Sequence, residues 1–138
     1  MREGLAVDTG PLVALLNARE RNHRWAREMF EAATPPLATC EAVITEACYL
    51  LREMKGGPQA VFGLLERGVL GIPFRLAENQ DAVQALMARY ANVPMSLADA
   101  CLVRMTELDP KATVLTLDGD FRVYRRHARQ VIPVLMPD

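Results

Sequence analysis

Histidine and cysteine, the usual protein ligands of zinc, are scarce in this 138-residue sequence. Its two histidines, His23 and His127, have no second histidine three or four positions away, a spacing that zinc-binding helices use. The three cysteines are an odd number without CxxC spacing, and each lies in an apolar, helix-like context. We therefore interpret Cys40, Cys48 and Cys101 as structural thiols and expect no zinc site.

Long apolar runs are also missing. No segment approaches the roughly 18–20 apolar residues of a membrane span, and residues 1–10 lack the apolar core of a signal peptide. These absences predict a cytoplasmic protein that does not contact a membrane. The apolar fraction of 51% and the charged fraction of 24% argue against disorder. We expect residues 1–138 to form one domain.

A strong net charge is lacking too, because the formal charge is only −1. Positive charge is nevertheless concentrated in two places. One group lies near residue 20 and comprises Arg19, Arg21, Arg24 and Arg27. The other lies near the C-terminus and comprises Arg122, Arg125, Arg126, His127 and Arg129. Two interpretations stay open for these groups: solvated helix faces, or contact with a phosphate backbone.

Short apolar segments alternate with segments of helical periodicity along the whole chain. We expect strands at about 5–8, 37–39, 72–75, 113–116 and 131–135, and helices at about 11–17, 22–33, 41–54, 58–67, 78–90 and 96–108. Strands that alternate with helices and lack hairpin turns indicate a parallel sheet covered on both faces. The sequence therefore predicts a single α/β domain.

Acidic residues stand where these apolar segments end or turn. Asp8 stands at the carboxyl end of the first expected strand, and Asp118 follows the fourth. Glu46 and Asp99 lie in helices, and Asp120 comes two residues after Asp118. Carboxylates are costly to hold near a core, so acids in such places require an explanation. In open α/β sheets the carboxyl ends of strands are where ligands bind. We expect these acids to converge at one edge of the sheet.

Each acid also has a structural alternative. Asp8 fits an Asx-type turn or a helix cap, and Glu46 fits a solvated helix face paired with Arg52 or Lys55. The triplet Asp-Thr-Gly at residues 8–10 also occurs in aspartic proteases, but those are built of β-strands, whereas this triplet leads into an apolar helix. Glu41, on the same helix as Glu46, is explained by its favourable position at the helix N-terminus.

The alternative for Asp99 is the most complete. Ser96-Leu97-Ala98-Asp99 fits a capping box, in which Asp99 reaches back to the first residue of the helix. Both a cap and a ligand role place the carboxylate at a helix N-terminus. Asp120 lies in a Gly-containing turn, which by itself indicates nothing.

Four carboxylates in a small volume repel one another unless a cation is present. Oxygen-only ligands favour Mg²⁺ or Mn²⁺ over zinc. These ions promote phosphodiester hydrolysis by polarising the phosphate and lowering the pKa of an attacking water. The acids alone suit DNA and RNA equally, and the number of ions stays open.

The combined pattern resembles the PIN-domain nucleases, and especially the VapC-type toxins of bacterial and archaeal toxin–antitoxin modules. Four segments carry the resemblance, in the family's order and over most of the chain: VDTGPLVALL, ITEACYLL, SLADACLV and TLDGDF. Each segment is short and weak alone, but the four together are specific. The resemblance implies a parallel five-stranded sheet with helices on both faces, in agreement with the expectation above.

The resemblance also implies roles for individual residues. Asp8, Glu46, Asp99 and Asp118 would form the acidic metal site, and Asp120 would assist or substitute. Polar residues that line or shape the pocket would be Thr9, Ser96 and Thr116. The residues that could hold the RNA backbone are Arg122, Arg125, Arg126 and Arg129.

The function that follows is an Mg²⁺- or Mn²⁺-dependent endoribonuclease, the toxin of a VapBC-type pair. Such toxins form homodimers and are inhibited by a small antitoxin. Two alternatives stay open: a stand-alone PIN-domain nuclease in RNA processing, and a PIN-fold binding module that acts through protein association. Apolar residues of the first two helices could supply association surfaces or belong to the core: Leu15, Leu16, Trp25 and Phe30.

Overall fold

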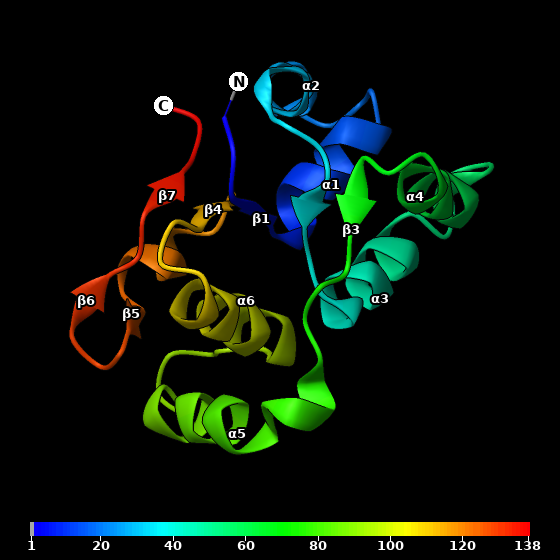
Figure 1. Cartoon of the computed structure of the whole chain (residues 1–138). Helices are drawn as coiled ribbons and strands as arrows, with labels where there is room; N and C mark the ends of the chain where they lie inside the picture. The colour runs from blue at the N-terminus through cyan, green and yellow to red at the C-terminus, as the bar shows by residue number, and fades with distance from the viewer. Residues whose placement is uncertain (1) are drawn as a thin grey trace.

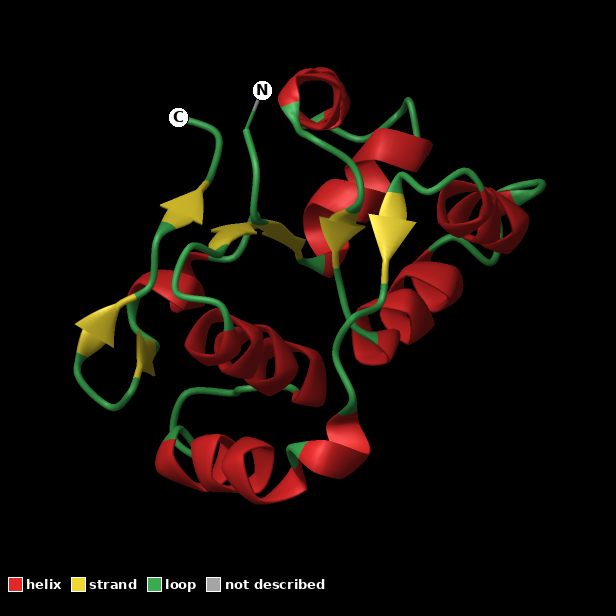
Figure 2. Cartoon of the chain, viewed as in Figure 1, coloured by secondary structure: helices red, strands yellow, loops and turns green. Residues whose placement is uncertain are grey.

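The computed structural model describes residues 2–138, which form a five-stranded parallel sheet and six α-helices (Figures 1 and 2). The strand order is β3-β2-β1-β4-β7, and every neighbouring pair is parallel. The strands are β1 (Leu5–Val7), β2 (Leu37–Ala38), β3 (Leu70–Gly71), β4 (Thr113–Leu115) and β7 (Val134–Leu135). The predicted α/β class with a five-stranded parallel sheet is confirmed.

The helices cover both faces of this sheet (Figure 1). The chain runs outward from β1 to β3 through α1 (Thr9–Leu16), α2 (His23–Ala32), α3 (Glu41–Leu50) and α4 (Gly57–Glu66). It then returns to β4 through η1 (Leu76–Glu78), α5 (Gln80–Arg89) and α6 (Leu97–Leu108). Since such crossovers are right-handed, the outward and return helices lie on opposite faces.

The change of direction occurs between β1 and β4, which lie side by side with Val7 opposite Leu115. In open α/β sheets this switch point leaves a crevice outside the carboxyl ends of the two strands. Asp8 directly follows β1, and Asp118 comes three residues after Leu115. The topology therefore brings two of the predicted acids to one place.

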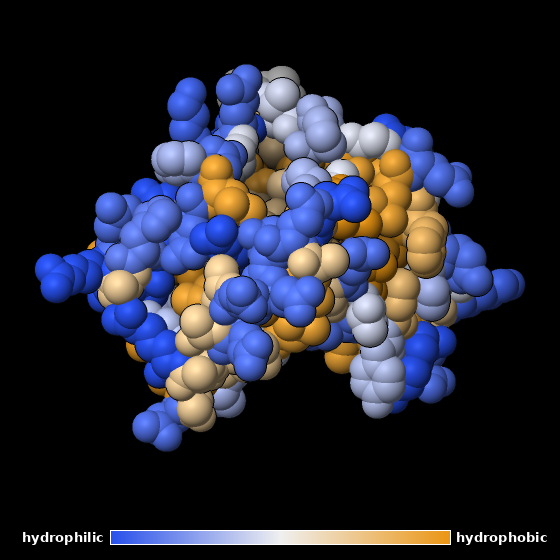
Figure 3. Space-filling model, turned by 60° about the horizontal axis from the view of Figure 1, so that its bottom comes forward, coloured by the Kyte–Doolittle hydropathy of each residue, from blue (hydrophilic) through white to orange (hydrophobic). Residues whose placement is uncertain are grey.

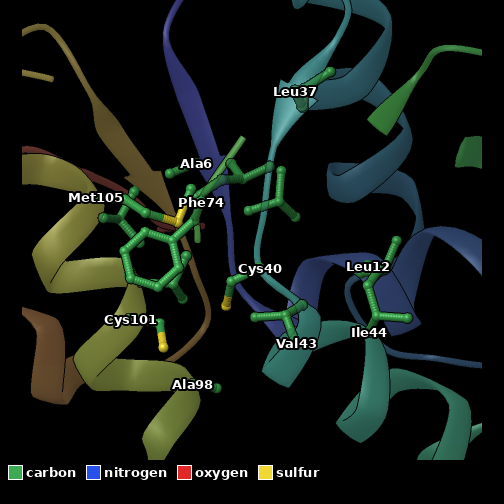
Figure 4. Close-up of a cluster of buried hydrophobic side chains, with 14 of the residues drawn as sticks. Ala6, Leu12, Leu37, Cys40, Val43, Ile44, Phe74, Ala98, Cys101 and Met105 are labelled. Carbon is green, nitrogen blue, oxygen red and sulfur yellow. The ribbon is translucent and has the colours of Figure 1, made fainter. Parts of the chain in front are cut away.

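The core is continuous on both sides of β1, whose three residues are all buried. Figure 4 shows part of this cluster, with Phe74 and Met105 packed near Ala6. Cys40 and Cys101 are buried in it as free thiols, and Cys48 is a partly exposed free thiol. These positions agree with the interpretation of the cysteines as structural residues.

The third and fifth strands were placed wrongly from the sequence. Residues 72–75 are irregular, and the strand is Leu70–Gly71. Pro73 has no backbone N–H to donate, while Phe74 is buried by side-chain packing alone. The helix expected at 41–54 ends at Leu50, and the fifth strand is only Val134–Leu135.

A hairpin that the sequence did not indicate precedes the last strand. It pairs β5 (Arg125–Arg126) with β6 (Gln130–Val131) in antiparallel fashion. Its turn contains His127 and Ala128 at φ values of 50° and 67°. Because glycine or asparagine usually occupies such positions, the turn carried no recognisable signal.

The face drawn in Figure 3 is mainly hydrophilic, with apolar patches among the polar side chains. None of the helices within residues 2–138 has the length and apolar character that a bilayer span requires.

Gly57 begins α4 at a point where another segment passes very close. A Cβ at this position would lie 2.1 Å from the Leu51 carbonyl oxygen and 2.9 Å from its Cβ. The nearer of these atoms, the carbonyl oxygen, belongs to the backbone and cannot rotate away as a side chain can. We therefore expect Gly57→Ala to lower the free energy of unfolding by about 1–3 kcal/mol. Urea unfolding measures this change.

Gly63, on the same helix, provides the control for this substitution. A Cβ there would meet only the end of the flexible Arg67 side chain, at 3.1 Å. Gly63→Ala is expected to be neutral or to stabilise by up to about 1 kcal/mol through helix propensity. Equal destabilisation by both substitutions would contradict the steric argument.

Candidate active site

Asp8 is held at the end of β1 by two short hydrogen bonds. Its Oδ1 accepts from the backbone N–H of Thr9 at 2.8 Å, and its Oδ2 accepts from the Thr116 hydroxyl at 2.7 Å. The residue is only 7% exposed and caps α1. The predicted cap role therefore exists, and it leaves Asp8 rigidly placed at the edge of the sheet.

Thr116 links the ends of the two central strands. Its fully buried hydroxyl donates to Asp8 and accepts from the backbone N–H of Asp118 at 2.9 Å. Asp118 Oδ1 in turn accepts from the backbone N–H of Asp120 at 2.9 Å and caps η2 (Gly119–Arg122). One hydroxyl thus couples the positions of Asp8 and Asp118.

Asp99 forms the predicted capping box at the start of α6. Its backbone N–H donates to the Ser96 hydroxyl at 3.0 Å, and its Oδ2 accepts from the Ser96 N–H at 3.4 Å. The same Oδ2 also accepts from the Tyr124 hydroxyl at 2.9 Å. A cap therefore explains only part of the surroundings of Asp99.

Glu46 lies on α3 and is exposed. Its Oε2 accepts from the Thr9 hydroxyl at 3.4 Å, a long hydrogen bond. The suggested pairing with Arg52 is not what the structure contains, because Arg52 pairs with its neighbour Glu53 at 3.8 Å. Glu46 is thus oriented toward the residue that follows Asp8, although less firmly held than the aspartates.

An open pocket of about 550 Å³ brings most of these residues together. Its lining includes Asp8, Thr9, Glu46, Ser96, Asp99 and Asp118. Asp120 and Thr116 do not line it: Thr116 lies buried beneath Asp8, and Asp120 is partly exposed in η2. Four of the five predicted acids therefore share one pocket.

Burial changes the acidity of the two most enclosed aspartates. It raises the pKa of Asp8 to about 6, against the opposing effect of the Thr116 and Thr9 hydrogen bonds. The charges of Asp99 and Asp118 add to the increase. Burial also raises the pKa of Asp99, and the Tyr124 hydrogen bond opposes that rise. A cation in the pocket would reverse both increases, since it favours the charged carboxylates.

The donor set suits a hard cation bound with water. Within residues 2–138, no three His, Cys, Asp or Glu side chains converge closely enough to hold an ion by themselves. Mg²⁺, however, usually binds through one or two carboxylates and keeps several waters. In the described part of the chain, Asp99 Oδ1 and Asp118 Oδ2 accept no hydrogen bond. These oxygens fit such an ion, whereas both Asp8 oxygens already have donors.

The predicted RNA-binding arginines lie outside this pocket. Arg122 ends the short 3-10 helix η2, whereas Arg125, Arg126 and Arg129 belong to the β5–β6 hairpin, so the helix-face interpretation fits only Arg122. Arg126 donates to the carbonyls of Thr106 and Pro110 near the C-terminal end of α6, and Arg125 donates to three carbonyls of its own segment. Arg122 and Arg129 are exposed.

The other basic group fits the solvated-face interpretation. Arg24 pairs with Glu28 at 3.5 Å, and Arg27 pairs with Glu31 at 3.4 Å, both one turn apart on α2. All four side chains are more than half exposed.

Tyr124 is the residue at this site that the sequence analysis missed. It is fully buried, and its contact with Asp99 spans 25 residues of the chain. Its burial, and then its carboxylate partner, raise its pKa well above the ordinary value for tyrosine, so the hydroxyl remains a donor. No local motif in the sequence signals this pairing.

A sequence model of the PIN domain matches residues 5–127. No curated protein matches the chain. The crystal structure of Mycobacterium tuberculosis VapC20, described as a Sarcin-Ricin loop cleaving toxin, is similar with a TM-score of 0.73 and 22% identity, over 94% of this chain and 99% of that one.

A second similar structure is VapBC2 from Rickettsia felis, solved bound to a DNA fragment from its promoter. Its TM-score is 0.66 at 14% identity, and the match covers 97% of this chain and 98% of that one. At these identities the two structures establish a shared fold. The sequence model covers most of the chain and agrees with the resemblance found in its four acidic segments, and this protein belongs to the PIN domain family.

Proposed function

We propose that this protein is a divalent-metal-dependent endoribonuclease, the toxin of a VapBC-type toxin–antitoxin pair. The observation that carries the proposal is the shared pocket of Asp8, Glu46, Asp99 and Asp118 at the switch point of the sheet. Similarity in fold to a toxin described as cleaving the Sarcin-Ricin loop supports RNA as the substrate.

Asp99 and Asp118 are the residues that would hold Mg²⁺ or Mn²⁺ directly, each through an oxygen without a protein donor. Asp8 and Glu46 would contribute negative charge and accept hydrogen bonds from waters, and Asp120 would assist from η2. A divalent ion at such a site supplies charge neutralisation at the phosphate and a more acidic water.

The remaining pocket residues position these groups. Thr116 holds Asp8 through its hydroxyl and holds the start of the Asp118 turn through the backbone. Thr9 donates to Glu46 and so orients it toward the pocket. Ser96 fixes the first turn of α6, which carries Asp99. The pocket is open to solvent, so a polymeric substrate can lie across it. A small-molecule substrate would be held better by an enclosed pocket.

Contact with the RNA backbone is proposed for Arg122 and Arg129, whose side chains are exposed. Arg125 and Arg126 are the weaker candidates of the four, because their guanidinium groups already donate to backbone carbonyls. A partner that approached this hairpin would have to compete for those bonds.

A small antitoxin, a homodimer and a cytoplasmic location complete the proposal. Leu15, Leu16, Trp25 and Phe30 are partly buried against the core, which favours the core interpretation for them. More exposed apolar side chains lie on α3 and α4: Tyr49, Leu50 and Phe62 are 61%, 56% and 54% exposed. These support a protein partner on α3 and α4.

Metal removal tests the proposed chemistry. Purified protein is incubated with a labelled RNA stem–loop in Mn²⁺, in Mg²⁺ and in excess EDTA, and fragments are resolved by gel electrophoresis. We expect cleavage with either ion and none in EDTA, because the carboxylates alone cannot neutralise the phosphate. Re-addition of Mn²⁺ should restore cleavage.

A single-stranded DNA of the same sequence is the substrate control. Equal cleavage of both would point to a nuclease that does not select RNA. Cleavage that persists in EDTA would contradict metal dependence, and absence of both cleavage and Mn²⁺ binding at millimolar concentration would favour the binding-module alternative.

A further inference from the structure

One buried tyrosine connects two parts of the acidic pocket that are distant in the sequence. The Tyr124 hydroxyl donates to Asp99 Oδ2 at 2.9 Å, and both residues are almost fully enclosed, at 0% and 7% exposure. Tyr124 follows Asp118 by six residues, and its backbone N–H donates to the Asp120 carbonyl at 3.0 Å. Its side chain thus ties α6 to the segment that carries Asp118.

The ring of Tyr124 is fixed by two aromatic neighbours. Phe121 meets it edge to face with ring centres 5.2 Å apart, and Tyr90 does so at the same distance. Phe121 is fully buried as well. A ring enclosed in this way has little rotational freedom, so the hydroxyl is a fixed donor, and the orientation of its acceptor is fixed with it.

This hydrogen bond determines how the Asp99 carboxylate is turned. Oδ2 receives two donors, the Tyr124 hydroxyl at 2.9 Å and the Ser96 N–H at a longer 3.4 Å. Within residues 2–138, Oδ1 receives none. The shorter bond, from a hydroxyl to a charged oxygen, is the stronger of the two. The capping box alone would hold the carboxylate weakly.

We propose that Tyr124 is a positioning residue of the active site, which holds Asp99 so that its Oδ1 remains available to a divalent cation. This inference rests on the proposed function and names a residue that acts through Asp99. Groups that hydrogen-bond to a ligating carboxylate commonly change metal affinity or activity by about 10–100-fold when removed.

Tyr124→Phe tests the inference, because it removes the hydroxyl and keeps the ring that Phe121 and Tyr90 contact. Mn²⁺ binding is titrated by electron paramagnetic resonance of the free ion, without RNA. We expect the Mn²⁺ dissociation constant to rise about 10-fold or more. In RNA cleavage, kcat should fall and recover in part at high Mn²⁺, while KM for RNA stays within about 2-fold.

Tyr90→Phe is the matched control. Tyr90 belongs to the same aromatic cluster, but its hydroxyl accepts from the backbone N–H of Arg125 at 3.0 Å and contacts no acid. This variant also loses one hydrogen bond, so it reports any general effect of loosening the cluster. We expect its Mn²⁺ affinity and kcat to stay within about 2-fold of the wild type.

The outcomes separate this inference from the proposed function. If wild-type protein binds Mn²⁺ and cleaves RNA, and Tyr124→Phe does both equally well, Tyr124 has no positioning role although the function stands. The same losses in Tyr90→Phe would also overturn the inference, since they would reflect packing. If the wild type neither binds Mn²⁺ nor cleaves RNA, the proposed function itself fails.

Discussion

Asp8→Asn is expected to lower RNA cleavage by about 10²–10³-fold, the range observed when one electrostatic contribution to a transition state is removed. Asparagine has nearly the shape of aspartate, so its side-chain oxygen can still accept from Thr9 N–H, as Asp8 does at 2.8 Å. What disappears is a negative charge beside Asp99 and Asp118 in the shared pocket, together with the oxygen that accepts from the Thr116 hydroxyl at 2.7 Å. The change therefore keeps the volume of the side chain while it removes the charge and one hydrogen-bond acceptor.

Rates of RNA cleavage at saturating Mn²⁺ measure this effect, and Asp81→Asn is the control. Asp81 is an exposed residue in the first turn of α5, so it undergoes the same chemical change outside the pocket. Its activity should equal that of the wild type. Cleavage by Asp8→Asn at the wild-type rate would refute the assignment of the pocket as the catalytic site.

The same substitution is expected to stabilise the metal-free protein at neutral pH. Burial raises the pKa of Asp8 from 3.8 to about 6, so the folded protein binds this proton more tightly than the unfolded chain does. The stability that protonation contributes is complete below the unfolded pKa and is lost as the pH rises through the folded pKa. At about 1.4 kcal/mol per pH unit, wild-type protein loses about 3 kcal/mol between pH 3 and pH 7.

Asp8→Asn does not titrate, so it should escape this loss. In urea unfolding with EDTA, the two proteins should have similar free energies of unfolding near pH 3. At pH 7.5 the variant should be more stable by about 3 kcal/mol. Comparing the two proteins at each pH removes the contribution of the other titrating groups. If the free energies of unfolding of the two proteins change with pH in the same way, the buried Asp8 carboxylate does not destabilise the folded protein.

Mn²⁺ should narrow this difference in stability. An ion that binds only the folded protein stabilises it in proportion to the logarithm of its concentration. Wild-type protein is therefore expected to gain from added Mn²⁺, while Asp8→Asn gains less. A residue that destabilises the metal-free protein but strengthens metal binding is typical of a functional site.

Much of the fold, and the positions of several acids in it, could be predicted from the sequence because they depend on local sequence patterns. The parallel sheet follows from apolar segments that alternate with helical ones, and Asp8 and Asp118 were recognisable because they directly follow such segments. Ser96 and Asp99 form the expected capping box because all its atoms lie within one helical turn. The errors at residues 72–75 and at the hairpin arose where side-chain packing or an unusual turn replaced the local signal.

The sequence by itself thus determined the fold class, the family and the four acids that share the pocket. Only the tertiary structure decided how those acids are held. The hydroxyl of Thr116 reaches Asp8 across 108 residues, and that of Tyr124 reaches Asp99 across 25. Tertiary packing also placed Arg126 against the C-terminal end of α6. Its positive charge had suggested a place beside the acidic pocket instead. Such contacts depend on how elements pack around a common core, and local periodicity carries no information about them.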